Sequence, residues 1–139
     1  MQILQPPEWA KPRGYSNGIV ASGRTVFLAG QFGCNAEGKF DTGDFAGQAR
    51  QSLKNIVAIL AEAGAGPEHI CRLNWYVADR KEYIASLRDV GAAYREIIGK
   101  HFPVMTALEV RGFMDEGARL EIEVTAMIPD QQAQGSGAG

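Results

Sequence analysis

The sequence contains few of the residues from which metal sites and covalent nucleophile sites are built. It has two histidines, His69 and His101, and two cysteines, Cys34 and Cys71, in 139 residues. Neither histidine stands at metal-ligand spacing from another histidine, cysteine or carboxylate, so we expect no metal. The cysteines lie far apart and outside any CxxC motif, which is typical of small buried thiols in a reducing compartment. A cysteine and a histidine that meet only in the fold stay a minor alternative.

The chain also lacks a basic excess, a long apolar run and a nucleotide-binding motif. Lys and Arg number 14 against 16 Asp and Glu, a formal net charge of −2, so nucleic acid is not an expected partner. No apolar run approaches the roughly 20 residues of a spanning helix, and residues 1–12 have no apolar signal-peptide core, so we expect no membrane partner. No GxSxG, P-loop or GxGxxG pattern is complete. We expect a soluble, cytoplasmic protein that binds a small molecule.

The length fits one domain, which we place at residues 1–130. Residues 131–139 are small, polar and rich in glycine, so we expect a disordered tail or a vector-derived remnant there. We find no internal repeat and no second domain.

Two segments show the period of an amphipathic helix. Apolar residues recur every three or four positions over residues 45–63 and 83–98. Both segments also carry start and stop signals. These signals are Asp44 and Gly64 for the first helix, and an Asp79/Glu82 capping box and Gly99 for the second.

Four segments alternate with the period of a half-buried strand: residues 25–30, 70–77, 105–110 and 120–127. A short strand at 19–21 is expected to pair with residues 25–30 through a Ser22-Gly23 turn. The order is β-β-α-β-α-β-β. Two one-sided helices can cover only one face of the sheet, which predicts an α+β fold with the other face against further copies of the chain.

Carboxylates gather on the last strands. Glu121 and Glu123 share one face of their strand, and we expect Glu109 of the preceding strand to join them. Carboxylates in a partly buried cleft can be tuned for proton transfer. The alternative is that they are solvated, or paired with Arg111 and Arg119.

Several short motifs follow the same order along the chain: YSNG at 15–18, VFLAGQ at 26–31, QARQSLKNIVAIL at 48–60, AGA at 63–65, FP at 102–103 and LEIEVTA at 120–126. Together they resemble the RidA family, also called YjgF/YER057c/UK114, over roughly residues 15–129. The resemblance implies a chorismate-mutase-like α+β fold, with a mixed sheet and two helices on one face, assembled as a homotrimer with clefts between subunits.

The resemblance also implies an activity and its residues. Members hydrolyse reactive enamines and imines such as 2-aminoacrylate to a keto acid and ammonia, without a cofactor. The residue that positions water corresponds to Glu121, our predicted catalytic residue, whereas Glu123 is expected to be structural or solvent-facing. Tyr15 and Gly30 match substrate-binding positions around the cleft, and we place Ala29, next to Gly30, among the substrate-binding residues as well.

The sequence departs from the family pattern where members bind the substrate carboxylate. The arginine found two residues after the proline is Met105 here, and the cysteine or small polar residue two positions later is Ala107. We place Met105, Thr106 and Ala107 among the substrate-binding residues. The segment between Val110 and Glu121 is also about one residue longer than usual. The chain resembles the Arg-lacking subgroup, so we expect a substrate other than 2-aminoacrylate.

Three functions follow from this pattern. The leading hypothesis is cofactor-free hydrolysis of a small enamine or imine in clefts between subunits, with Glu121 activating water. A metabolite-binding or regulatory trimer without catalysis is the second. An endoribonuclease is the third, and it is disfavoured by the acidic charge and by the absence of a basic groove interleaved with aromatic residues.

Overall fold

The computed structural model describes residues 1–130, so the tail expected at 131–139 lies outside the described residues. Along the chain, the elements are β1 (Gln2–Leu4), β2 (Gly18–Val20), β3 (Arg24–Gln31), α1 (Phe45–Glu62), the short 3₁₀ turn η1 (Pro67–His69), β4 (Ile70–Val77), α2 (Arg80–Ala85), α3 (Leu87–Ile97), β5 (Val104–Glu109) and β6 (Leu120–Ile128). No helix in residues 1–130 is long and apolar enough to cross a bilayer.

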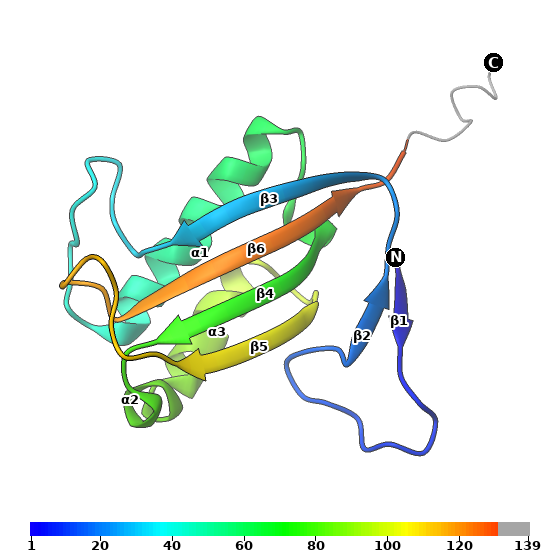
Figure 1. Cartoon of the computed structure of the whole chain (residues 1–139), viewed down its shortest axis with the longest axis horizontal. Coiled ribbons are helices and arrows are strands. Elements are labelled where there is room, and N and C mark those ends of the chain that lie inside the picture. The colour runs from blue at the N-terminus through cyan, green and yellow to red at the C-terminus, as the bar shows by residue number, and fades with distance from the viewer. Residues whose placement is uncertain (131–139) are drawn as a thin grey trace.

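Four strands form one mixed sheet in the order β3-β6-β4-β5. β4 and β5 are parallel, and the other two pairs are antiparallel. Helices α1 and α3 lie behind one face of this sheet, and no helix covers the face turned to the viewer in Figure 1. The predicted α+β class, with a mixed sheet and its helices on one face, is confirmed.

The alternation of β6 determines what each face of the sheet carries. Leu120, Ile122, Val124 and Ala126 are at most 1% exposed and pack under the helices. The residues between them, including Glu121 and Glu123, point to the uncovered face and are half-buried. Burying each large apolar side chain contributes about 1.5–3 kcal/mol, which fixes the strand's orientation because a one-residue slip would exchange the two faces.

The expected pairing of residues 19–21 with residues 25–30 is wrong. β2 pairs instead with β1, from Gln2↔Val20 to Leu4↔Gly18, and this hairpin stands beside the sheet in Figure 1. Gly23, at φ +133°, packs against the backbone of Ile128, so closely that a β-carbon would overlap with its carbonyl. The chain therefore crosses the end of β6 rather than folding back along β3.

The second predicted helix is two helices. α2 ends at Ala85 and α3 begins at Leu87, so three α-helices are present in residues 1–130. Asp79 caps α2 by accepting a hydrogen bond from the Lys81 amide at 2.9 Å. Glu82 does not complete the expected capping box, because its carboxylate binds the guanidinium of Arg119.

A buried glutamine on α1 joins two loops. Gln48 is 0% exposed, and its Nε2 donates hydrogen bonds to the carbonyls of Thr42 and Gly117, both at 3.0 Å. Its Oε1 accepts a hydrogen bond from the Arg119 amide at 2.7 Å. One side chain thus satisfies three backbone groups at the start of α1 and just before β6.

We expect Gln48→Met to destabilise the fold, because it leaves those backbone groups buried without partners. The free energy of unfolding, measured by urea denaturation, should fall by about 1–3 kcal/mol. Lys54→Met, an exposed change on the same helix, controls for helix propensity and hydrophobicity. Equal losses in the two variants would contradict this role for Gln48.

Candidate functional site

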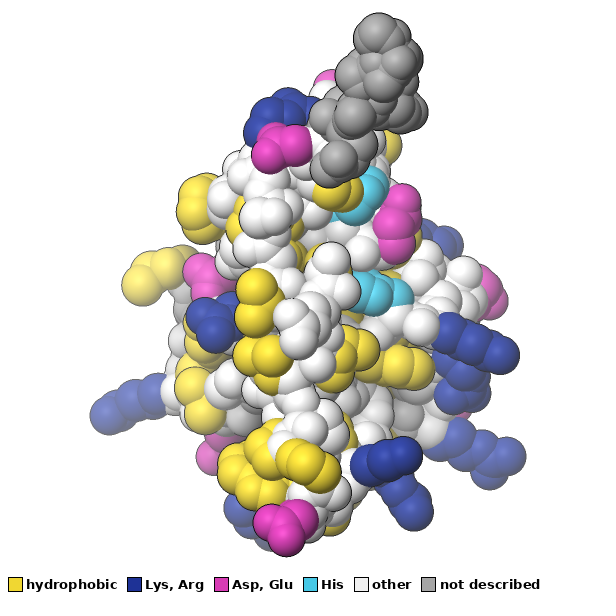
Figure 2. Space-filling view, turned by 90° about the vertical axis from the view of Figure 1, so that its right-hand side faces the viewer, with side chains coloured by type: hydrophobic (Ala, Val, Ile, Leu, Met, Phe, Trp, Pro, Cys, Tyr) yellow, Lys and Arg dark blue, Asp and Glu magenta, His cyan; other side chains and the backbone are white. Residues whose placement is uncertain are grey.

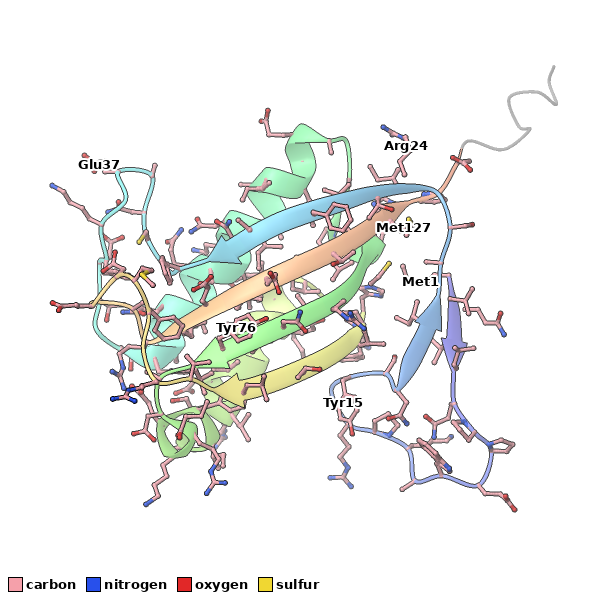
Figure 3. All side chains as sticks on the ribbon, viewed as in Figure 1. Met1, Tyr15, Arg24, Glu37, Tyr76 and Met127 are labelled. Atoms are coloured by element: carbon pink, nitrogen blue, oxygen red, sulfur yellow. The ribbon has the colours of Figure 1, made fainter. Side chains whose placement is uncertain are left out.

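Two carboxylates lie on the uncovered face of the sheet, beside Tyr76 (Figure 3). Glu123 is held by β4: its Oε1 accepts hydrogen bonds from Asn74 Nδ2 at 3.1 Å and from the Tyr76 hydroxyl at 3.0 Å. The bond to Glu123 is the main reason that the pKa of Tyr76 is raised. Glu123 is thus a hydrogen-bonded member of the sheet surface.

Glu121 lies in a different environment two residues before Glu123. Within residues 1–130, no hydrogen-bond donor or cation pairs with its carboxylate. Partial burial, and next the negative charge of Glu123, raises the pKa of Glu121 above its ordinary value. A half-buried carboxylate with a raised pKa and unused acceptor atoms is suited to accept and return a proton.

A bulge in β3 makes room for Glu121. Leu28 pairs with Val124 but Gln31 pairs with Ile122, so β3 has one extra residue at Ala29–Gly30. A β-carbon on Gly30 would overlap with the Glu121 carboxylate. Bulges re-aim neighbouring groups and leave part of the ladder unpaired. The structure thus brings Ala29, Gly30 and Glu121 together.

The third expected carboxylate lies elsewhere. Glu109 is in register with Val77, whose side chain faces the helices, and its Oε1 accepts a hydrogen bond from the Arg80 amide at 2.7 Å. The expectation that Glu109 joins Glu121 on one face is wrong, because parallel pairing with β4 sets Glu109 on the opposite face. Arg119 is committed to Glu82 and does not pair with Glu121.

A cavity of about 580 Å³ lies on the helix side of β5. The register Leu73↔Met105 and Trp75↔Ala107 points Met105 and Ala107 toward the helices, where Tyr15 also lines the cavity. Aromatic and apolar side chains supply much of the remaining wall: Trp75, Tyr83, Leu87, Val90, Tyr94 and Phe102.

Thr106 faces the other side of the sheet from Met105. It pairs with Asn74 and lines a second hollow of about 550 Å³, between the N-terminal hairpin and the sheet, together with Arg72 and Tyr15. Figure 2 views the molecule from this end and shows hydrophobic side chains along its middle, with Lys and Arg on either side.

The predicted site residues thus form two groups that one chain does not bring together. Ala29, Gly30 and Glu121 lie at β3 and β6, whereas the cavity with Met105 lies at β5, the opposite edge of the sheet. β4 separates the two groups; Met105 and Ala107 face the helices, whereas Glu121 faces the uncovered side of the sheet, as Thr106 does. A single site containing both would need two copies of the chain.

The histidines and cysteines take structural positions. His69 Nδ1 accepts a hydrogen bond from the Gly66 amide at 3.0 Å. His101 Nε2 lies 2.7 Å from the Ile70 carbonyl. Figure 2 shows the histidine side chains in cyan. Burial raises the pKa of Cys34 and of Cys71, which disfavours the nucleophilic thiolate. Among residues 1–130, no three metal-ligating side chains come together.

Comparison with known proteins decides the family. The family model described as Endoribonuclease L-PSP matches residues 8–128. A solved member of the YjgF/YER057c/UK114 family from Mycobacterium tuberculosis is 32% identical, with a TM-score of 0.61, over 84% of this chain and 88% of that one. This chain belongs to the RidA family.

Other RidA relatives agree with this assignment. A Rid-family protein of unknown function from Yersinia pestis superimposes with a TM-score of 0.80 at 28% identity, over 91% of this chain and 98% of that one. A human 2-iminobutanoate/2-iminopropanoate deaminase is 29% identical over 114 residues, which are 81% of this chain and 79% of the human protein. A RutC family protein of Pyrococcus abyssi is 33% identical, over 78% of this chain and 84% of that one.

Sequence reasoning missed most of the cavity. Arg13 and Arg95 line it, and neither was singled out. The spacing of Leu87, Gly91 and Arg95 on α3 could have indicated that they share a helix face, because residues four apart are neighbours. No local signal indicates that this face meets the segment around Tyr15.

The raised pKa of Glu121 predicts a pH-dependent stability. A carboxyl group that binds its proton more tightly in the folded state destabilises the fold once it ionises. We therefore expect Glu121→Gln to be more stable than wild type at neutral pH in urea denaturation. The gain should shrink as pH falls through the folded pKa and vanish below the ordinary carboxyl pKa of about 4.3.

Glu37→Gln, in an exposed turn, controls for the loss of one negative charge. A Glu121→Gln variant that is less stable than wild type at neutral pH, or a gain that is independent of pH, would contradict the assigned environment of Glu121.

Proposed function

We propose that this RidA-family protein hydrolyses a small imine, or the enamine that tautomerises to it, to a carbonyl compound and ammonia. The observation that carries the proposal is Glu121, a half-buried carboxylate with a raised pKa and without a partner in residues 1–130, set over Gly30. Relatives named as 2-iminobutanoate/2-iminopropanoate deaminases support this class of reaction.

The chemistry needs one group that takes a proton and gives it back. Glu121 accepts a proton from water as the water oxygen adds to the imine carbon, and passes this proton to the imine nitrogen to give a carbinolamine. Glu121 then accepts the hydroxyl proton as the carbonyl forms and passes it to the amine nitrogen, so that the C–N bond breaks and ammonia leaves. One water is consumed and one ammonia formed, so no oxidant or reductant is required.

We also propose that the protein works as a homotrimer whose sites lie between copies. The uncovered face carries large exposed side chains, Phe27 at 79% and Leu108 at 52% exposure, beside the carboxylates. Such a face is typical of an interface between copies. An arrangement in which the β3–β6 side of one copy meets the β5 edge of the next would bring Glu121 to the cavity.

Two alternative functions can be distinguished from imine hydrolysis by experiment. A protein that binds imines or keto acids without releasing ammonia would be the metabolite-binding trimer. The description of the family model names an endoribonuclease, so cleavage of single-stranded RNA that is lost in Glu121→Gln would favour that function. The net charge of −2 gives little attraction for a phosphate backbone.

We expect Glu121→Gln to lower the rate of imine hydrolysis by about 10²–10⁴-fold, the range of a positioned general base. The imine is generated in situ from an L-amino acid by an oxidase, and its hydrolysis is measured by competition with semicarbazide. Gly30→Ala should also lose most of the activity, because its β-carbon displaces the Glu121 carboxylate.

Glu123→Gln is the matched control, since it removes a charge from the same strand face but not the proposed base. Thermal melts confirm folding of each variant. Equal losses at Glu121 and Glu123, or full activity in Glu121→Gln, would rule out the assigned role.

A further inference from the structure

The cavity beside β5 has an aromatic wall. Trp75 is 2% exposed and its ring centre lies 6.0 Å from that of Tyr83, while Tyr94 and Phe102 stack at 5.8 Å. Met105, in the position where the resemblance implies an arginine, packs against the core beside these rings. Its thioether adds polarizable apolar surface and no hydrogen-bond donor.

Two arginines lie at this cavity without an acidic partner. Arg13 and Arg95 both line it and both are exposed, and neither forms an ion pair within residues 1–130. Arg50 and Arg119, by contrast, are each paired with a glutamate. Unpaired guanidinium groups beside an apolar cavity are suited to bind a carboxylate by charge-assisted hydrogen bonds.

The side chain of Arg95 lies next to Gly91, one helical turn earlier on α3. A β-carbon on Gly91 would lie 3.7 Å from Nη1 of Arg95, so the arginine runs back along α3 over the glycine and toward the cavity that both residues line. Helical side chains point toward the N-terminus of their helix, and residues four apart are neighbours. A larger residue at Gly91 would occupy the cavity.

We propose that this cavity binds a carboxylate whose other end is aromatic or bulky and apolar, and that Arg13 and Arg95 take the carboxylate in place of residue 105. The proposal deepens the proposed function, on which it rests: the substrate would be the imine of a large apolar amino acid. The volume, about 580 Å³, is within the usual range for ligand sites, and a three-carbon imino acid would leave most of the aromatic wall uncovered.

Trp75, one of the residues that line the cavity, also carries an unsatisfied polar atom. Trp75 Nε1 is buried and has no hydrogen-bond partner within residues 1–130. A polar ligand atom that reached this N–H through a small adjustment of the ring would form a hydrogen bond without breaking one. The same residue also supplies a probe for ligand binding.

Intrinsic fluorescence of the full chain tests the proposal without relying on activity. The chain has two tryptophans, and Trp9 is 61% exposed, so Trp9→Phe leaves Trp75 in the cavity wall as the emitter. Stable probes are 3-phenylpropanoate, its uncharged amide and propanoate. We expect 3-phenylpropanoate to change Trp75 emission and to bind at least about tenfold more tightly than either of the other two.

Substitutions in the cavity test which residues bind the carboxylate end of the ligand and which bind its aromatic end. Arg13→Gln together with Arg95→Gln should weaken 3-phenylpropanoate binding by about tenfold and leave the amide unchanged. Arg88→Gln, an exposed change on the same helix at a residue that does not line the cavity, should have no effect. Gly91→Leu should abolish binding, and Met105→Arg should shift preference toward propanoate.

The outcomes separate this proposal from the proposed function. Equal binding of acid and amide, or unchanged binding in the double arginine variant, overturns the role of the arginines, and no binding of either aromatic probe overturns the ligand class. Small imines hydrolysed faster than the phenylalanine-derived imine would overturn the ligand class and leave the hydrolase function intact. Binding that follows the predicted order in a protein that releases no ammonia would retain the ligand class and reject the hydrolase.

Discussion

The alternation of β6 is the constraint on which the rest of the structure depends. Its apolar residues face the helices, so Glu121 and Glu123 must face the other way, and no helix covers that side. Cross-strand bonds from β4 then hold Glu123, whereas the bulge at Ala29–Gly30 leaves space for Glu121. Two carboxylates on one strand thereby receive different environments: Glu123 is hydrogen-bonded to β4, whereas Glu121 has a raised pKa and no partner in the described residues.

The alternation of β5 and β6 places the proposed base and the proposed substrate cavity on opposite faces of the sheet. Met105 and Ala107 point to the helix side, where aromatic side chains line the cavity, while Glu121 lies on the other face of the sheet. In our proposal, Met105 in place of the arginine that the resemblance implies need not remove the carboxylate contact, because Arg13 and Arg95 lie at the same cavity. Recognition of the substrate and activation of water are then separable properties, supplied in our account by adjacent copies.

Sequence patterns predicted the helices and strands, because these depend on residues that are close together in the sequence. Helical and strand periods located α1, β4 and β6 to within one or two residues, because each buries one continuous face. The pairing of β2 and the face of Glu109 could not be predicted in this way, since both depend on strand partners distant in sequence. Tyr15 and Glu121 were predicted through the family resemblance, whereas the arginines depend on α3 meeting a loop some 80 residues away.

Subunit complementation tests the central claim, that a cavity of one copy works with Glu121 of another. Glu121→Gln and Gly91→Leu chains, each inactive alone, are refolded together, and sedimentation equilibrium establishes that the mixture is trimeric. If the site is shared, every mixed trimer restores one site, so about a quarter of wild-type activity returns in an equal mixture. Trimers that form but stay inactive would place the cavity and Glu121 in separate sites and contradict the account.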